Sequence, residues 1–269
     1  MEKPVPEVPA AGEWLKALLL QLVDRAAFDL DDLDANPGLA LHRLRLRMKK
    51  AEALLRLSKG AVRKTSRWQL RKQIKDIKQV GSDQRDAEVI EELAKELGRK
   101  YGLHLAMAPI QRRKPNRGKL RDLLGQLRRG LSEEIFDGLT WEDVEDNYSA
   151  CYRSGRRRMR VAQRTLAAED LHRWRKRVKA LYYQSQALGS TLSHSRHRLN
   201  RMRKLGKMLG RDHDLTLLEQ ETAEKSPDNP WQEVIQTRRE KLRRQILSQG
   251  EGVYKPAAHR FARMRGQPL

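Results

Sequence analysis

Residues 171–181 read LHRWRKRVKAL, and residues 41–51 read LHRLRLRMKKA. Laid over each other, the two stretches match His42 with His172, Arg45 with Arg175 and Lys49 with Lys179. Their apolar residues also match, at the intervals of three and four that mark one buried stripe of a helix. These residues are Leu41, Leu44, Met48 and Ala51 in the first stretch, and Leu171, Trp174, Val178 and Leu181 in the second. Each stretch therefore predicts a helix with one core face and a cationic flank, and the repeat predicts two versions of one unit.

The composition predicts an all-α protein with a polyanionic partner. The chain has 269 residues, with 57 Lys and Arg against 35 Asp and Glu, a formal net charge of +22. β-Branched and aromatic residues are few, and no stretch alternates with a period of two, so strands are not expected. Both halves of the chain are basic, which favours nucleic acid, polyphosphate or another polyanion as the partner.

Other features of the composition favour a cytoplasmic location. Cys151 is the single cysteine, which excludes an internal disulfide and fits a reducing compartment. No apolar run approaches the ~20 residues of a membrane span, so no membrane partner is expected. The acidic, proline-rich start of the chain is unlike a signal peptide, and residues 1–11 are expected to be disordered.

The first half, residues 12–138, is expected to form one helical bundle. Turn residues at 36–38, 60 and 81–83 separate helices predicted over about 14–30, 39–58, 62–80, 85–97 and 119–136. Residues 99–118 are basic and broken by glycine and proline, so a mobile loop is expected there. The helix over 62–80 carries a cationic stripe formed by Lys64, Arg67, Arg71, Lys75 and Lys78.

The second half, residues 139–269, is expected to form a second bundle in the same order. Helices are predicted over about 141–166, from 168 through the second motif, over 192–209, from Gly210 onward, and over 231–248. Residues 250–269 are expected to be a basic tail. Aligning Arg211 with Arg85 pairs Arg201 with Lys75 and Lys204 with Lys78.

The motif helices each offer three different cationic groups in one row. At about 100° per residue, His42, Arg45 and Lys49 fall within about 60° of one another on a helix, as do their counterparts in the second half. Phosphate oxygens suit this set, because arginine binds them bidentately, lysine as a point charge and histidine as a donor. The alternative is a solvated charged flank with a stray histidine. Geometry alone does not exclude the other flank, formed by Arg43, Arg47, Arg173 and Arg177, but the repeated histidine favours the first.

A family resemblance rests on these motifs taken together. The first half supplies LHRLRLRMKK and QRDAEV, and the second supplies YRSGRRRMR, LHRWRKRVKALYY and LGKMLGRDHDL. The pattern resembles the CHAD family, an α-helical domain named for its histidines, over about residues 14–265. The resemblance implies two helical bundles related by a pseudo-twofold axis around a basic central channel, and binding of inorganic polyphosphate.

The resemblance also implies the residues of the site. His42, Arg45, Lys49, His172, Arg175 and Lys179 would line the channel, and Lys75, Lys78, Arg201 and Lys204 would face it from neighbouring helices. Asp86 and Asp212 belong to Arg-Asp steps predicted at helix starts, where a carboxylate caps free amides and orients nearby arginines.

The sequence predicts neither an enzyme nor a cofactor or metal. His194 and His197 lack a third ligand at suitable spacing, and a structural role is favoured over Mg²⁺ binding for Asp212, His213 and Asp214. No GxxxxGK[ST] phosphate loop occurs. The second-ranked function is nucleic-acid binding, which would need a broad basic face or stacking aromatics. With only three Phe, and Trp174 on a core position, polyphosphate binding is favoured, which would suit association with polyphosphate granules.

Overall fold

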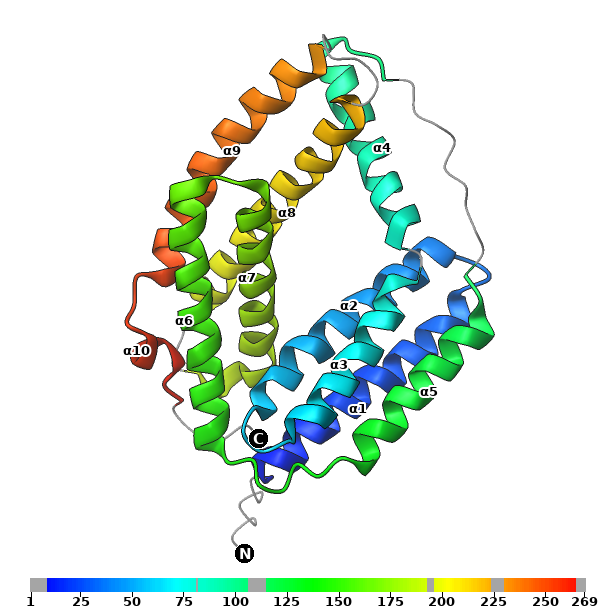
Figure 1. Cartoon of the computed structure of the whole chain (residues 1–269), viewed down its shortest axis with the longest axis vertical. Helices are drawn as coiled ribbons and strands as arrows, with labels where there is room; N and C mark the ends of the chain where they lie inside the picture. The colour runs from blue at the N-terminus through cyan, green and yellow to red at the C-terminus, as the bar shows by residue number, and fades with distance from the viewer. Residues whose placement is uncertain (1–8, 81, 106–114, 193–195, 224–229, 265–269) are drawn as a thin grey trace, which may run out of the picture.

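The computed structural model describes residues 9–80, 82–105, 115–192, 196–223 and 230–264. Within these ranges the regular structure is entirely helical and no β-strand forms, which confirms the all-α prediction (Figure 1). The apolar stripes of both motifs are buried as predicted, and Leu44, Met48, Trp174, Val178 and Leu181 are fully inaccessible.

Four helices of the first half pack into one group. These are α1 (Ala11–Asp29), α2 (Pro37–Leu55), α3 (Lys64–Gln79) and α5 (Arg117–Glu133). Each helix contacts two others, in the order α2, α1, α5, α3 and back to α2, so the group closes around its own core. Asn36 caps α2 by accepting a hydrogen bond from the backbone N–H of Leu39, and Pro37 occupies the first helical position. Gly60, at φ +103°, ends the segment that follows α2.

The second group contains the other motif helix. Its members are α6 (Trp141–Thr165), α7 (Ala168–Leu188), α8 (Arg196–Ala223) and α9 (Pro230–Tyr254), with the short α10 (Ala258–Ala262) against α6. Contacts run from α6 to α7, α7 to α8, α8 to α9 and α9 back to α6. Thr140 and Asp143 form a reciprocal capping box at the start of α6.

Two expectations for the second half are wrong. The predicted break at Gly210 does not occur, because α8 is one continuous helix from Arg196 to Ala223. Residues 250–262 are not a simple basic tail, because α9 extends to Tyr254, and Tyr254, Phe261 and Ala262 are buried. The Phe261 ring stacks on Tyr152 of α6 with ring centroids 4.0 Å apart, so aromatic packing holds the end of the described chain.

Helix α4 (Ser82–Tyr101) leaves the first group and packs against the second (Figure 1). Its Leu93, Ala94 and Leu97 form a separate small core with Leu215 and Leu218 of α8 and Trp231 and Ile235 of α9. The helix runs past the expected end near residue 97, and Gly102, at φ +67°, follows it. Of the loop expected over 99–118, residues 106–114 lie outside the described residues.

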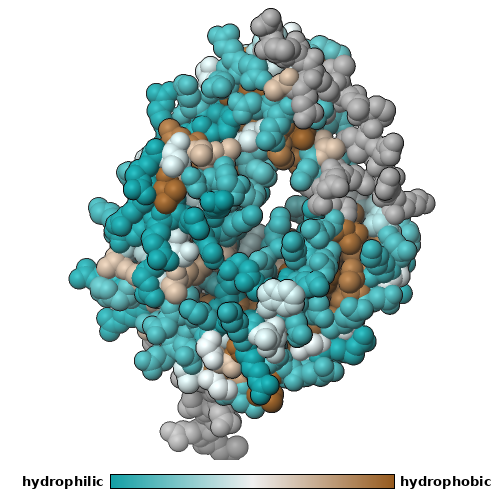
Figure 2. Space-filling model, viewed as in Figure 1, coloured by the Kyte–Doolittle hydropathy of each residue, from teal (hydrophilic) through white to brown (hydrophobic). Residues whose placement is uncertain are grey.

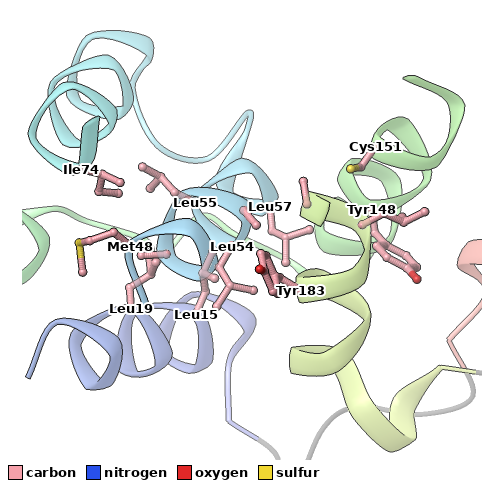
Figure 3. Packing of buried hydrophobic residues seen from close by; sticks show 14 of the residues in the cluster. Leu15, Leu19, Met48, Leu54, Leu55, Leu57, Ile74, Tyr148, Cys151 and Tyr183 are labelled. Atoms are coloured by element: carbon pink, nitrogen blue, oxygen red, sulfur yellow. The ribbon is translucent and has the colours of Figure 1, made fainter. Parts of the chain in front are cut away.

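The two groups meet where α2 contacts α7. Figure 3 shows Tyr183 of α7 beside Leu54 of α2, and both residues are buried. Next to them, the Gln184 side chain donates a hydrogen bond to the Ala53 carbonyl at 2.8 Å. The Asn147 amide of α6 donates to the carbonyls of Leu57 and Lys59, which fastens the end of α2 to the second group.

The molecule has an opening near its middle. Figure 2 shows hydrophilic side chains along much of its border, and comparison with Figure 1 places it among α8, α4 and the first helical group. The cationic flanks of the two motif helices meet near the α2–α7 contact, where Arg175 and Lys179 of α7 lie close enough to lower the pKa of Lys49 of α2.

Packing around Gly250 of α9 provides a test of the fold. A Cβ atom at Gly250 would lie 2.6 Å from Cη2 of the buried Trp174 indole. We therefore expect Gly250→Ala to lower the free energy of unfolding by about 1–3 kcal/mol through overpacking. Gly138→Ala is the matched control, because a Cβ there meets no atom within 4 Å, and its effect should stay below about 1 kcal/mol. Urea denaturation of the two variants checks this, and equal effects would contradict the α7–α9 packing.

Candidate anion-binding site

The α2–α7 contact brings Lys49 of α2 into the charge field of α7. Burial lowers the pKa of Lys49 to about 8, and the nearby charges of Arg175, Arg45, Lys78 and Lys179 add to the shift. The side chain nevertheless keeps contact with solvent. Lys49 is thus repelled by neighbouring cations and remains accessible to a ligand.

Lys179 and Arg175 lie along a glycine strip on α8. A Cβ atom at Gly206 would meet Cε of Lys179 at 3.3 Å, and one at Gly210 would meet Nε of Arg175 at 3.6 Å. The pKa of Lys179 is lowered by burial and then by the charges of Arg175 and Lys207. The glycines let the cationic side chains lie close to the helix backbone, which also explains the use of Gly210 inside a continuous helix.

His172 is held neutral at the edge of these cations. Its pKa is lowered to about 4, first by burial and then by the charges of His213, Lys176 and Arg175, with a small opposing effect of Glu169. The His172 and His213 rings lie with centroids 4.4 Å apart. Nδ1 of His172 and Nε of Arg175 are buried and have no hydrogen-bond partner within the described part of the chain.

We call this set the inner cluster, and its members come from four helices: Arg45, Lys49, Lys78, His172, Arg175, Lys179 and Lys207. Arg45 is fixed by a 3.2 Å hydrogen bond from its Nε to the Lys78 carbonyl, which ties α2 to α3. Six of these residues were predicted for the site from the sequence. Lys207 was missed, although its position three residues after Lys204 in a basic helix was visible in the sequence.

Four residues predicted for the site are not members of the inner cluster. Lys75, Lys204 and Arg201 lie apart from it, and His42 lies at its margin. Lys75 and Lys204 are exposed on α3 and α8. Arg201 points to α9, where its guanidinium fills the space beside Gly252. His42 is exposed on α2, three residues before Arg45.

The burial pattern explains the misplaced Arg201. The register inferred from the Arg-Asp steps sets the buried Ile74 and Ile77 of α3 against the exposed Asn200 and Arg203 of α8. A shift of two residues sets them against the buried Met202 and Leu205 instead. The Arg-Asp steps were therefore a poor guide to register, because α3 and α4 are separate helices whereas α8 is continuous.

The opposite flanks of the motif helices are largely engaged in ion pairs. Arg43 contacts Asp32 at 3.0 Å, and Arg47 binds both carboxylate oxygens of Asp29. Arg173 contacts Glu169 at 2.7 Å. These arginines are neutralised by neighbours, whereas the charges that shift Lys49 and Lys179 are all positive. The inner flank thus carries unbalanced charge, whereas Arg43, Arg47 and Arg173 are paired with acids.

The Arg-Asp steps do not cap helices as predicted. Asp86 lies inside α4, and Asp212 lies in the middle of α8. Asp212 is buried and accepts a 3.0 Å hydrogen bond from Arg243 of α9, with Arg239 at 3.7 Å. The predicted role of orienting arginines is therefore confirmed for Asp212.

These contacts also bear on the metal hypotheses. Because Asp212 is engaged with α9, it is not available as a Mg²⁺ ligand beside His213 and Asp214. Across the described ranges, no group of three or more His, Cys, Asp or Glu side chains is arranged to hold a metal ion. His194 lies outside the described residues, so the pair with His197 is not described.

The fold and the site define a helical domain in which cations from four helices gather. The family model of the CHAD domain matches residues 13–223, which is most of the chain, and the protein therefore belongs to the CHAD domain family. This confirms the resemblance seen in the motifs. A comparison with curated proteins found no match. None of the helices in the described ranges has the length and apolarity that crossing a membrane would require.

Repulsion within the inner cluster should limit stability in the absence of a ligand. We expect Lys49→Gln to raise the melting temperature at low salt by about 1–4 °C, corresponding to at most about 1 kcal/mol for a chain of this size after allowance for solvent screening. The gain should shrink at high salt. Lys241→Gln is the control, because Lys241 is an exposed cation on α9. Differential scanning fluorimetry measures both variants, and a lower melting temperature for Lys49→Gln would show that Lys49 is stabilised by its surroundings.

Proposed function

We propose that the protein binds inorganic polyphosphate non-covalently, without catalysis, through the inner cluster. The observation that carries the proposal is the convergence of Lys49, Arg175 and Lys179 from two motif helices, with only cations among the charges that shift the lysine pKa values. Membership of the CHAD family is compatible with this function. A polyanion would replace repulsion by attraction at these side chains.

The chemistry of the cluster suits a linear chain of phosphates. Long polyphosphate carries about one negative charge per phosphate, and neutralising several charges at once releases counterions, as it does for nucleic acids. Arg175 can bind two oxygens with its fork, while Lys49 and Lys179 act as point charges. The opening in Figure 2 has hydrophilic side chains along much of its border, which favours a slim polymer without bases.

We further propose that the two halves are copies of one unit arranged around a basic channel. The support is the matched motif pair on α2 and α7, each followed by a basic helix, and the contact between the two motif helices. In this arrangement one phosphate chain meets the same residue types from both halves. Association with polyphosphate granules in the cytoplasm would follow from such binding.

Nucleic-acid binding is the second candidate, and one observation favours it. Trp68 of α3 has 64% of its surface exposed, and Nζ of Lys72 lies 5.6 Å from the centroid of its ring. An exposed indole beside cations can stack on a base, and such stacking contributes about 1–3 kcal/mol. Competition of labelled polyphosphate by unlabelled polyphosphate, DNA and RNA at matched charge separates the candidates. If RNA displaces the labelled polyphosphate more strongly than unlabelled polyphosphate does, and Trp68→Ala abolishes this difference, nucleic-acid binding is favoured.

A pair of double variants tests the polyphosphate site. We expect Lys49→Gln with Lys179→Gln to weaken polyphosphate binding by about 10- to 100-fold, because hydrogen bonds to charged groups contribute about 1.5–3 kcal/mol each. Arg160→Gln with Arg164→Gln is the control, because it removes the same charge from exposed positions on α6. Its effect should be about threefold or less at physiological salt, where distant charges are screened.

The binding isotherms should be measured at several salt concentrations. In the wild-type protein the affinity should fall steeply with salt, and the slope should be smaller in the inner double variant. Unchanged circular dichroism confirms that the variants are folded. Equal losses in the two double variants would mean that the basic surface acts as a diffuse field, which would overturn the site.

Binding should also be linked to protonation of His172. The ring is neutral in the free protein because its pKa is lowered to about 4 by burial and by neighbouring cations. A polyanion against the ring favours the charged form and raises this pKa. Binding should therefore take up protons between the free and bound pKa values, and affinity should increase as the pH falls from neutral toward about 4.

Calorimetry in buffers of different ionisation enthalpy measures this proton uptake. His172→Gln should reduce the uptake, whereas His197→Gln, at an exposed position on α8, should leave it unchanged. Identical uptake in the two variants would exclude His172 from contact with the ligand.

A further inference from the structure

A second group of cations lies where the two helical groups meet, apart from the inner cluster. We call it the arginine cluster, and it consists of Arg56 of η2 (Arg56–Ser58), Arg71 of α3, Arg158 of α6 and Arg177 of α7. Contacts of η2 with α6 and of α2 with α7 bring these elements together. The Asn147 side chain holds η2 against α6 through hydrogen bonds of 2.9 and 2.8 Å to the Leu57 and Lys59 carbonyls. Both halves of the chain thus contribute arginines to one place.

Glu52 separates the arginine cluster from the inner cluster. Its carboxylate binds Lys78 on the inner side, and it contacts Arg56 at 3.1 Å and Arg71 at 3.9 Å. Burial alone would raise the pKa of Glu52, but the hydrogen bond from Lys78 and the nearby cations lower it overall. The carboxylate is therefore ionised at neutral pH. One negative charge shared with Lys78 cannot balance four guanidinium groups.

Arg177 of α7 lies mainly among the other arginines of the cluster. Arg177 is half-buried, and its pKa is lowered by burial and by the charges of Arg56, Arg158 and Arg71, with an opposing effect of Cys151. The Cys151 thiol does not neutralise the arginines, because burial raises its pKa to about 11 and the thiol stays protonated. Nε of Arg56 and Nη1 of the neighbouring Arg67 are buried without a hydrogen-bond partner in the described ranges.

Guanidinium groups that outnumber the acids beside them suit a compact phosphate group. Each offers a planar fork that pairs with two phosphate oxygens, and a doubly charged anion can accept from several forks at once. Partial burial excludes water and strengthens such contacts. The arginine composition distinguishes this cluster from the lysine-rich inner cluster, where point charges would track a longer chain.

We propose that Arg56, Arg71, Arg158 and Arg177 form a second anion site, which takes a compact, multiply charged phosphate group between the two halves. The group could be a small phosphate compound such as pyrophosphate, or one segment of a phosphate chain. The site does not depend on the inner cluster, because Glu52 lies between the two.

The test uses pyrophosphate and the full chain carrying Lys49→Gln and Lys179→Gln, which weakens the contribution of the inner cluster. Isothermal titration calorimetry at fixed ionic strength should detect pyrophosphate binding in this background. Adding Arg158→Gln with Arg177→Gln should weaken it by about tenfold or more, as expected for loss of charged hydrogen bonds. Adding Arg160→Gln with Arg164→Gln instead removes the same charge from exposed positions of α6 and should change affinity by about threefold or less.

The outcomes separate this site from the polyphosphate proposal. No pyrophosphate binding in the background protein, or equal affinity in the two derived proteins, would overturn the arginine site whatever polyphosphate does. If the Arg158 and Arg177 variant does not fold by circular dichroism, Arg71→Gln replaces it. The Arg71 side chain is 49% exposed, and unchanged affinity in that variant would also overturn the site.

A second titration with long-chain polyphosphate, in the otherwise wild-type chain, identifies the source of the phosphate group. If Arg158→Gln with Arg177→Gln weakens the binding of pyrophosphate but not of polyphosphate, the site is assigned to a free small phosphate compound. Weakening of both ligands assigns it to a segment of the chain.

Discussion

The structure depends on holding two cationic helices together at the α2–α7 contact. Lys49 and Arg45 on one helix face the charges of Arg175 and Lys179 on the other, which is repulsive. Apolar burial of Leu54 and Tyr183 and the hydrogen bond from Gln184 to the Ala53 carbonyl oppose this repulsion. Burial of apolar area is insensitive to charge, so it can hold like charges close in a way that ion pairing cannot. The apolar packing at the α2–α7 contact thereby maintains a repulsion between cations, which an anionic ligand would relieve.

The cations of this protein fall into three environments with different consequences. On the outer flanks, Arg43, Arg47 and Arg173 form ion pairs with acidic residues. In the inner cluster, Lys49 and Lys179 have lowered pKa values and lie among other cations. Between the halves, arginines gather around the single carboxylate of Glu52. The net charge of +22 alone does not distinguish these environments. What separates them is the position of a few acids.

Helix α4 belongs to the first half of the sequence but packs against helices of the second half. The first group closes around its own core without α4, and α4 instead forms a small apolar core with α8 and α9. Polar contacts reinforce this docking, since the Trp231 indole N–H donates to the His104 carbonyl at 3.3 Å and Arg238 lies over the Tyr101 ring. The first half therefore reaches the second at two separate places, α2–α7 and α4–α8, and the opening lies between them (Figure 1, Figure 2).

The spacing of residues along the chain predicts most of the helices, the buried stripes and most of the inner cluster. Periodicity is a local property, so the spacing of the residues alone assigns Leu44 and Trp174 to the core and His172, Arg175 and Lys179 to one flank. What that flank faces follows from the packing of the helices and not from the spacing. The continuity of α8 through Gly210, the orientation of Arg201 toward Gly252, the role of Lys207 and the gathering of Arg177 with Arg71 all depend on neighbours distant in sequence. A helical pattern specifies which side of a helix is apolar, but it carries no information about which other helix lies against each polar flank.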